Sequence, residues 1–264
     1  MTYNVMRYGL DDRDGDGQKN DPKPADEVAA IVTIIAAEKP DVLAVQEIGS
    51  PLYFEELRRK LRQAGLDYTH ADYVPGPVPD TGNLAVYSRF PIVSKQPITN
   101  EVYAIGAQRL PVLRGFLSVD IEPEPGCRFR LMTAHLKSKV FDPNGQTEMR
   151  RNEARLLAKH IRNAIASDKQ LNLLVAGDLG DTVDSSAVRE ILASGVTDLR
   201  PADPMGDVWS RYVKAQDAYE RVDYLLASPA MLRRCIAAKS RTVRHPLLHD
   251  ASDHRPLVAV FAAK

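Results

Sequence analysis

The hydrophobic positions of the chain follow two different periods, which alternate from the N-terminus to the C-terminus. Apolar runs of strand length occur at residues 1–8, 41–46, 83–91, 112–121, 128–134, 171–176, 221–227 and 255–262. Apolar positions three and four residues apart, with capping and breaking signals at their ends, predict helices at residues 24–39, 51–65, 147–167 and 184–195. Strands that alternate with helices along one chain predict an α/β protein.

Polar residues stand at the ends of these predicted strands in a repeated pattern. An apolar strand that carries an acid, an amide or an imidazole near its end, when it recurs, gathers a site at one edge of an α/β sheet. The residues that follow this pattern are Asn4, Glu47, His135, Asp178, Asp223, Asp253 and His254. The sequence therefore predicts one polar site assembled from segments that are spread over the whole chain.

In order and spacing, these segments resemble the endonuclease/exonuclease/phosphatase superfamily, which has the deoxyribonuclease-I-like fold. The resemblance runs from residue 1 to about residue 261. It implies a single domain over residues 1–264, built as a four-layer α/β/β/α sandwich in which two mixed β-sheets pack face to face with helices outside. It also implies a divalent-metal-dependent phosphoesterase that hydrolyses phosphodiester bonds by the attack of an activated water.

The oxygen-bearing side chains of this set suit a hard divalent cation. Mg²⁺ binds carboxylate and amide oxygens, so Glu47 and Asn4 are the expected ligand pair. The resemblance adds Asp253 as a residue that supports the metal site. The expected cofactor is Mg²⁺ or Mn²⁺.

The resemblance also implies roles for the remaining residues. His254 acts as general base or binds the phosphoryl oxygens, and Asp223 orients its imidazole. Asp178 positions the nucleophile, and His135 contacts the phosphate or helps to protonate the leaving group. The candidates for substrate binding are Arg114, Lys137 and Asn83.

One position departs from the family pattern. Where the family has the Asn of a Gly-Asp-Phe-Asn-Asp segment, this chain has Gly180, which lacks the amide that would contact the phosphate or the attacking water. One expectation is that Gly180→Asn raises phosphodiesterase activity about 10-fold or more, because it restores a polar contact to developing charge. The alternative is a catalytically weak module that keeps the fold and a phosphate-binding pocket.

The charge balance bears on the substrate. The chain has 35 Lys and Arg residues against 35 Asp and Glu residues, whereas binding of long duplex DNA relies on neutralising many phosphates. We therefore expect a small phosphodiester or a short oligonucleotide as substrate, with a nuclease acting on DNA or RNA as the alternative. No protein partner is inferred. The basic face predicted for the helix at 147–167 is interpreted as solvated and contains Arg150, Arg151, Arg155 and Lys159.

The loop at residues 9–23 carries a second candidate metal site. Asp12, Asp14, Asp16 and Gly17 match the first half of a calcium-binding loop, but Lys23 stands where such loops have a bidentate Glu. The simpler interpretation is a solvated acidic loop that uses Asp and Gly for its turns.

Two further features concern the surroundings of the protein. No apolar run reaches membrane-spanning length, and Met1 lies directly on the first predicted strand. We therefore expect that a signal peptide has been removed and that the protein is secreted or periplasmic, with a cytoplasmic location left open. Cys127 and Cys235 either form a disulfide or are two separate thiols.

Overall fold

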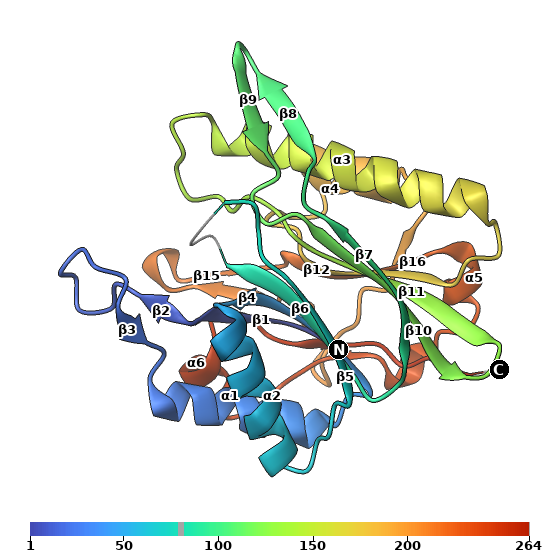
Figure 1. The fold of residues 1–264 in the computed structure, drawn as a ribbon, viewed down its shortest axis with the longest axis horizontal. Helices are drawn as coiled ribbons and strands as arrows, with labels where there is room; N and C mark the ends of the chain where they lie inside the picture. The colour runs from blue at the N-terminus through green and yellow to red at the C-terminus, as the bar shows by residue number, and fades with distance from the viewer. Residues whose placement is uncertain (79–81, 264) are drawn as a thin grey trace.

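Two six-stranded β-sheets form the centre of the computed structural model, which describes residues 1–78 and 82–263 (Figure 1). The strand order in the first sheet is β17 (Arg241–Thr242), β18 (Leu257–Val258), β1 (Thr2–Tyr8), β4 (Val42–Ile48), β6 (Asn83–Ser88) and β5 (His70–Val74). The order in the second sheet is β13 (Thr197–Asp198), β16 (Asp223–Ala227), β12 (Leu173–Asp178), β11 (Cys127–His135), β10 (Phe116–Glu124) and β7 (Ile92–Ile98).

Helices cover the outer face of each sheet (Figure 1). The first sheet is covered by α1 (Ala25–Glu38), α2 (Pro51–Gln63) and the short α6 (Leu248–Ala251). The second sheet is covered by α3 (Gln146–Ser167) and α4 (Ser186–Leu192), and α5 (Pro229–Leu232) follows β16. Three small hairpins lie outside the sheets: β2 (Leu10–Asp11) with β3 (Asp21–Pro22), β8 (Val102–Ile105) with β9 (Gln108–Pro111), and β14 (Arg211–Val213) with β15 (Ala218–Glu220).

The hydrophobic core is divided into three layers, as the four-layer prediction requires. Ile31 and Ile35, one turn apart on α1, are fully buried against the first sheet, and Leu157 of α3 is fully buried against the second. Between the sheets, side chains such as Val86 and Val119 form a third cluster. The predicted α/β/β/α sandwich is therefore confirmed.

Strand register places the polar strand ends side by side. In the second sheet, His135 of β11 pairs with Asp178 of β12, and Asp178 pairs in turn with Asp223 of β16. In the first sheet, Asn4 of β1 pairs with Gln46 of β4, so that Glu47 follows directly. The two sheets pack face to face, and Asn4 of the first sheet donates to Asp178 of the second, so both rows of polar residues lie at the same edge of the sandwich.

A buried glutamine holds the two sheets together just below this edge. Gln46 is fully buried, and its Nε2 donates to Thr133 Oγ1 of the opposite sheet at 3.0 Å. Its Oε1 accepts from Thr2 Oγ1 at 3.2 Å. Since a buried amide costs free energy unless it is hydrogen-bonded, these contacts fix how the two sheets face each other.

The structure corrects several predicted boundaries. The strand predicted at 112–121 begins only at Phe116, because the turn at Gly115 has a positive φ of 63°. The strand predicted at 255–262 is regular only over Leu257–Val258. The helix predicted at 184–195 is regular over Ser186–Leu192, because Ser185 caps it by accepting from Val188 N.

Arg150 does not lie on a solvated basic face of α3, as the sequence pattern had suggested. It is 3% exposed, and its Nε and Nη2 donate to Asp181 Oδ2 at 2.9 and 2.7 Å. Its Nη1 donates to the carbonyl oxygens of Lys137 and Ser138. Arg150 therefore ties the helix to the two loops that follow β11 and β12.

Candidate active site

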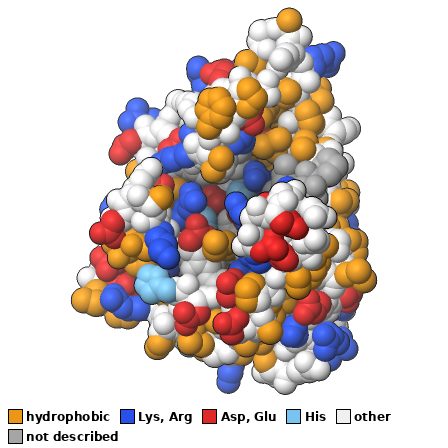
Figure 2. Space-filling view, turned by 90° about the vertical axis from the view of Figure 1, so that its left-hand side faces the viewer, with side chains coloured by type: hydrophobic (Ala, Val, Ile, Leu, Met, Phe, Trp, Pro, Cys, Tyr) orange, Lys and Arg blue, Asp and Glu red, His pale blue; other side chains and the backbone are white. Residues whose placement is uncertain are grey.

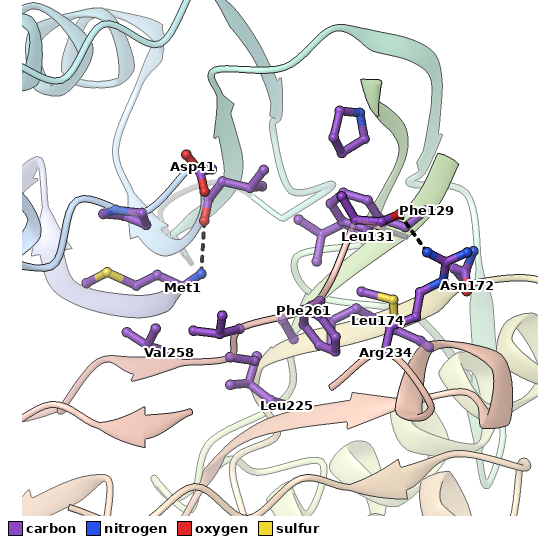
Figure 3. Close-up of a pocket in the computed structure, with 18 of the residues that line it drawn as sticks. Met1, Asp41, Phe129, Leu131, Asn172, Leu174, Leu225, Arg234, Val258 and Phe261 are labelled. Carbon is purple, nitrogen blue, oxygen red and sulfur yellow. Dashed lines mark hydrogen bonds between the residues drawn. The ribbon is translucent and has the colours of Figure 1, made fainter. Parts of the chain in front are cut away.

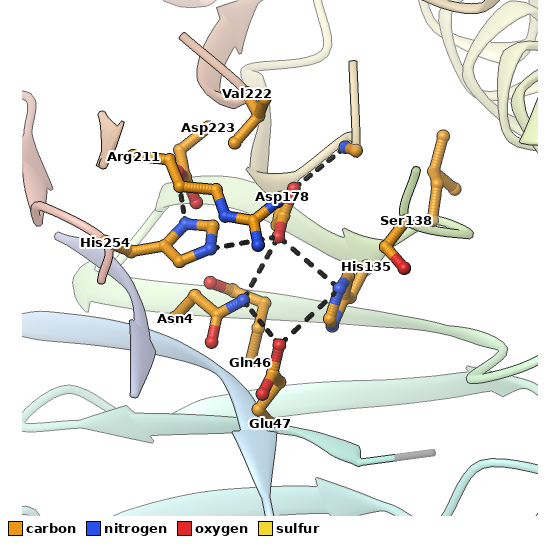
Figure 4. Close-up of polar contacts among 12 residues, drawn as sticks. Asn4, Gln46, Glu47, His135, Ser138, Asp178, Arg211, Val222, Asp223 and His254 are labelled. Carbon is orange, nitrogen blue, oxygen red and sulfur yellow. Dashed lines mark hydrogen bonds and ion pairs between the residues drawn. The ribbon is translucent and has the colours of Figure 1, made fainter. Parts of the chain in front are cut away.

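Asp178 lies at the centre of the polar strand ends (Figure 4). Its Oδ1 accepts from the backbone N–H of Gly180 at 2.8 Å, and its Oδ2 accepts from Asn4 Nδ2 at 3.1 Å. The Nε2 atoms of His135 and His254 lie 3.4 and 3.7 Å from the same Oδ2. Burial raises the pKa of the Asp178 carboxyl, with the nearby Asp223 acting in the same direction. Asp178 is thus a carboxyl that is suited to exchange a proton within this cluster.

Glu47 faces Asp178 from the other sheet and has an unusual backbone. Its φ is 63°, in the left-handed region that costs a non-glycine residue about 1–2 kcal/mol. The carboxylate accepts from Asn4 Nδ2 at 3.0 Å and from the backbone N–H of Arg7 at 2.9 Å. Strain of this kind persists where the surrounding structure enforces it, often at functional sites. Here it turns the carboxylate of a strand residue into the site.

His254 and Asp223 form a buried pair. His254 Nδ1 lies 2.7 Å from Asp223 Oδ2, and both residues are less than 5% exposed. Burial lowers the pKa of His254, but the neighbouring carboxylates, Asp223 foremost, outweigh burial and raise it to about 10. The imidazole is therefore protonated at neutral pH, and its Nε2–H points toward Asp178.

His135 has the opposite character. Burial lowers its pKa well below the usual range, and the positive charges of Arg114 and His254 lower it further. The ring is therefore neutral. Its Nδ1 is buried and has no hydrogen-bond partner within residues 1–78 and 82–263. A buried ring nitrogen without a partner is the kind of group that a bound ligand satisfies.

Two serines that the strand-end pattern did not single out hold this arrangement in place. Ser252 Oγ donates to the carbonyl oxygen of Asn4 at 2.9 Å and accepts from the backbone N–H of His254 at 3.1 Å. Ser210 Oγ accepts from the backbone N–H groups of Val222 and Asp223. Ser252 stands immediately before the Asp-His pair, so its position was visible in the sequence.

Arg211 is a further site residue that the sequence pattern missed. It lies on β14, and its guanidinium projects over His254 and Asp178 (Figure 4). Its Nε donates to Asp253 Oδ2 at 3.1 Å. The other carboxylate oxygen of Asp253 is 3.8 Å from His254 Nε2. The predicted metal-supporting Asp253 therefore lies at the site, where its partner is an arginine.

The three predicted substrate-binding residues differ in their surroundings. Arg114 Nη1 donates to the carbonyl oxygen of Leu136, next to His135. Lys137 is 7% exposed, and its Nζ donates to the carbonyl oxygen of Val140. The amide of Asn83 is occupied by backbone groups of neighbouring turns: Gly76 N, Ile48 O and Gly49 O. A role in substrate binding stays a prediction for all three.

The side chains present at the site fit a divalent cation. The carboxylates of Glu47 and Asp178 both accept from Asn4 Nδ2, and Asp178 and Asp223 have ligand atoms within 4.8 Å of each other, whereas the protonated His254 between them offers no lone pair to a metal. Carboxylate and amide oxygens are the donors that Mg²⁺ and Mn²⁺ prefer. Figure 2 shows a hollow in this face of the molecule, in which acidic, basic and His side chains gather.

The loop at residues 9–23 brings together a different set of carboxylates from the one predicted for a calcium-binding loop. Asp12 and Asp14 lie with Asp21, and the three offer carboxylate oxygens within 4.8 Å of one another. Asp16 instead accepts from Gln18 within its own turn. The β2–β3 pairing brings Asp21 back across the loop, so a calcium site stays a prediction with Asp21 in the place of Asp16.

Gly180 has no room for the side chain that the family pattern would place there. Its φ is 68°, and a Cβ atom would lie 2.8 Å from the carbonyl oxygen of Lys137 and 3.1 Å from Cδ of Arg150. The sequence-based expectation that Gly180→Asn raises activity therefore has a structural obstacle: the buried Arg150 lies against this position.

We expect Gly180→Asn to destabilise the fold and to leave kcat/KM at or below the wild-type value. The left-handed backbone alone costs a non-glycine residue about 1–2 kcal/mol, although Asn tolerates it better than most. Gly180→Ala is the matched control, because it adds the Cβ without the amide. Urea unfolding and kcat/KM of both variants measure the effect. An Asn variant that is as stable and more active than wild type would restore the original expectation.

A separate cavity of about 360 Å³ lies at the other end of the sandwich, near the chain termini (Figure 3). Its lining is mainly apolar and includes Leu131, Leu174 and Phe261. The clustered acids and imidazoles described above are not among its lining residues, so this cavity is separate from the candidate active site.

Cys127 and Cys235 are free thiols. No helix in the described part of the chain is long and apolar enough to cross a membrane.

Comparison with known proteins identifies the class. The sequence profile of the Endonuclease/Exonuclease/phosphatase family matches residues 1–254. The chain belongs to this family, whose members are metal-dependent phosphoesterases. A sequence search against curated proteins finds no match.

Solved structures share the fold. Beta toxin from Staphylococcus aureus matches with a TM-score of 0.70 at 15% identity, covering 99% of this chain and 98% of that chain. Sphingomyelinase C from Streptomyces griseocarneus gives 0.69 at 20%, covering 98% and 97%. The catalytic domain of human nocturnin gives 0.68 at 18%, covering 98% and 93%. A mutant of the beta toxin with bound magnesium ions gives 0.66 at 16%, covering 99% and 98%.

Proposed function

We propose that this protein hydrolyses phosphodiester bonds with a bound Mg²⁺ or Mn²⁺ ion. The observation that carries the proposal is the position of Asp178, whose carboxylate is surrounded by Asn4, His135 and His254 and faces Glu47 across the two sheets. Phosphoryl transfer depends mainly on positioning and on stabilising charge, and this cluster supplies both acidic and basic groups at short range. The magnesium-bound relative supports the choice of metal.

Glu47 and Asn4 would hold the metal ion, with Asp253 in support. The ion would neutralise charge on the phosphoryl group and lower the pKa of water. Asn4 holds Glu47 and Asp178 through one amide nitrogen, so it fixes the distance between the metal side and the proton-accepting side of the site.

Asp178 would position the attacking water and accept its proton, since burial raises the pKa of this carboxyl. Of the two roles considered for His254, binding of the phosphoryl oxygens suits it better than that of general base, because its pKa of about 10 keeps the imidazole protonated. Asp223 would orient that imidazole. The neutral His135 would contact the phosphate or assist the leaving group.

The preferred substrate in this proposal is a small phosphodiester or a short oligonucleotide. The acidic loop between β2 and β3 follows β1, the strand that carries Asn4, and extends beyond the sheet (Figure 1). Arg7, at the start of this segment, donates its backbone N–H to Glu47 and ion-pairs with Asp11, so the loop begins beside the site. Negative charge at the mouth disfavours a long polyanion more than a compact ester.

The test compares an aryl phosphodiester with duplex DNA, each with Mg²⁺, with Mn²⁺ and with excess chelator. We expect metal-dependent turnover of the small ester, loss of that turnover with chelator, and poor cleavage of the duplex between about 50 and 200 mM salt. Efficient duplex cleavage that falls steeply with salt would favour the nuclease. Binding of phosphate without turnover of either substrate would favour the weak phosphate-binding module suggested by Gly180.

A further inference from the structure

The backbone of Arg211 is fixed directly opposite the proposed catalytic histidine. Arg211 and His254 form an antiparallel β-bridge. On either side of it, Tyr212 N donates to the carbonyl oxygen of Asp253 at 2.8 Å, and Arg255 N donates to that of Ser210 at 2.6 Å. These hydrogen bonds attach the β14–β15 hairpin to the segment that carries Asp253 and His254, and they fix the position of the Arg211 backbone.

The side chain of Arg211 has donors to spare. Its Nε donates to Asp253, whereas Nη1 and Nη2 make no hydrogen bond to any described residue. The side chain is only 26% exposed. Arg150, which is buried at this edge, contrasts with Arg211: Nε, Nη1 and Nη2 of Arg150 all have protein acceptors. An arginine that serves only to hold the structure together resembles Arg150 rather than Arg211.

The charge of Arg211 acts on the centre of the site. Burial opposes this charge, but Asp253, and more weakly Asp178 and Glu47, outweigh burial and raise the pKa of the guanidinium. The same charge contributes to the lowered pKa of His135. Both shifts indicate that the guanidinium lies within electrostatic reach of the groups gathered around Asp178.

We propose that Arg211 binds the non-bridging oxygens of the scissile phosphoryl group through its free Nη1 and Nη2, and so is a catalytic residue of this chain. The inference rests on the proposed phosphodiesterase function and adds to it the group that neutralises the phosphate on the His254 side, opposite Glu47. A planar guanidinium with two parallel N–H donors matches two phosphate oxygens, which a single ammonium does not. Asp253 aims the fork by holding Nε.

The test measures two quantities on Arg211→Ala and Arg211→Lys: the affinity for inorganic phosphate in excess chelator, by calorimetry, and kcat/KM for an aryl phosphodiester with Mg²⁺. For Arg211→Ala we expect at least about 10-fold weaker phosphate binding. We also expect about a 10²–10³-fold lower kcat/KM, the usual loss when one donor to developing charge is removed. Arg211→Lys keeps the charge without the fork, so it should recover only part of both losses.

Two controls separate this role from a structural one. Arg130→Ala removes another partly buried arginine, bound to Asp120 in the middle of the second sheet, and should leave both quantities within about twofold. Asp253→Asn removes the counter-charge of Arg211 but keeps a carbonyl for Nε; it should bind phosphate at least as tightly as wild type. If Arg211 served only to neutralise Asp253, the double variant Arg211→Ala/Asp253→Asn would bind phosphate as tightly as wild type, which would overturn the proposal.

The two proposals can fail separately. Wild-type protein that binds phosphate through Arg211 but hydrolyses no phosphodiester would contradict the proposed function and would still support the anion site. Active wild type together with an Arg211→Ala variant of normal kcat/KM and phosphate affinity would sink the role of Arg211 alone. If circular dichroism shows that Arg211→Ala folds poorly, the test uses Arg211→Lys alone. A Lys variant with wild-type phosphate affinity and kcat/KM would contradict binding of phosphate by the two Nη donors.

Discussion

Glu47→Ala is expected to abolish metal-dependent phosphodiester hydrolysis, by about three orders of magnitude or more in kcat/KM, while the protein stays folded. Glu47 offers a carboxylate that the backbone aims into the site through a strained φ, and Asn4 and Arg7 hold it there. Loss of a metal ligand removes both charge neutralisation and activation of water. The measurement is kcat/KM for an aryl phosphodiester, together with Mn²⁺ affinity by calorimetry.

Glu101→Ala is a suitable matched control for this experiment. The side chain of Glu101 is 19% exposed against 21% for Glu47, and it is bound to His160, away from the polar strand ends. We expect the control to retain activity. A folded Glu47→Ala protein with near-normal turnover and undiminished Mn²⁺ affinity would remove Glu47 from the metal site.

His254→Ala and Asp223→Ala are each expected to lower kcat by about 10²–10⁴-fold, and the double variant should be little worse than His254→Ala. Asp223 is 2% exposed, and its Oδ2 lies 2.7 Å from His254 Nδ1, so we expect it to act through the imidazole. Effects that pass through one group do not add. The measurement is kcat for the two single variants and the double variant under saturating metal.

The pH profile gives an independent check on this pair. Because Asp223 keeps the pKa of His254 raised to about 10, Asp223→Asn should bring that pKa down toward its ordinary value, and an activity limit on the alkaline side should move to lower pH. Multiplicative losses in the double variant, with an unmoved alkaline limit, would mean that Asp223 works independently of His254.

The sequence was sufficient for those parts of the fold that depend on local pattern. Buried strands such as β4 and β12 contain continuous apolar runs. An acid at the end of such a run lies at the edge of the sheet, where it can be solvated or paired, which is why the positions of Glu47 and Asp178 could be predicted. Register was not available from pattern, yet it is register that pairs His135 with Asp178 and Asp178 with Asp223.

The residues that sequence reasoning missed depend on contacts between distant segments. Arg211 lies on a three-residue strand without an apolar run, and only its bridge to His254 places it at the site. Arg150 has helical spacing typical of a solvated cation, and its burial depends on Asp181, 31 residues later. The obstacle at Gly180 likewise comes from Arg150 and from Lys137 O, neither of which is a sequence neighbour.

The position of β18 has a consequence for the time at which the site first exists. This strand lies between β17 and β1 in the first sheet, and the segment before it carries Asp253 and His254. Asn4, by contrast, is the third residue of β1. A chain growing on the ribosome therefore presents Asn4 long before His254, and it cannot complete the cluster until the segment with Asp253 and His254 has emerged. A nascent or prematurely terminated chain contains most of the sandwich without His254. Such a chain would lack the cluster on which the proposed hydrolysis depends, so the site cannot form before Asp253, His254 and β18 have been synthesised.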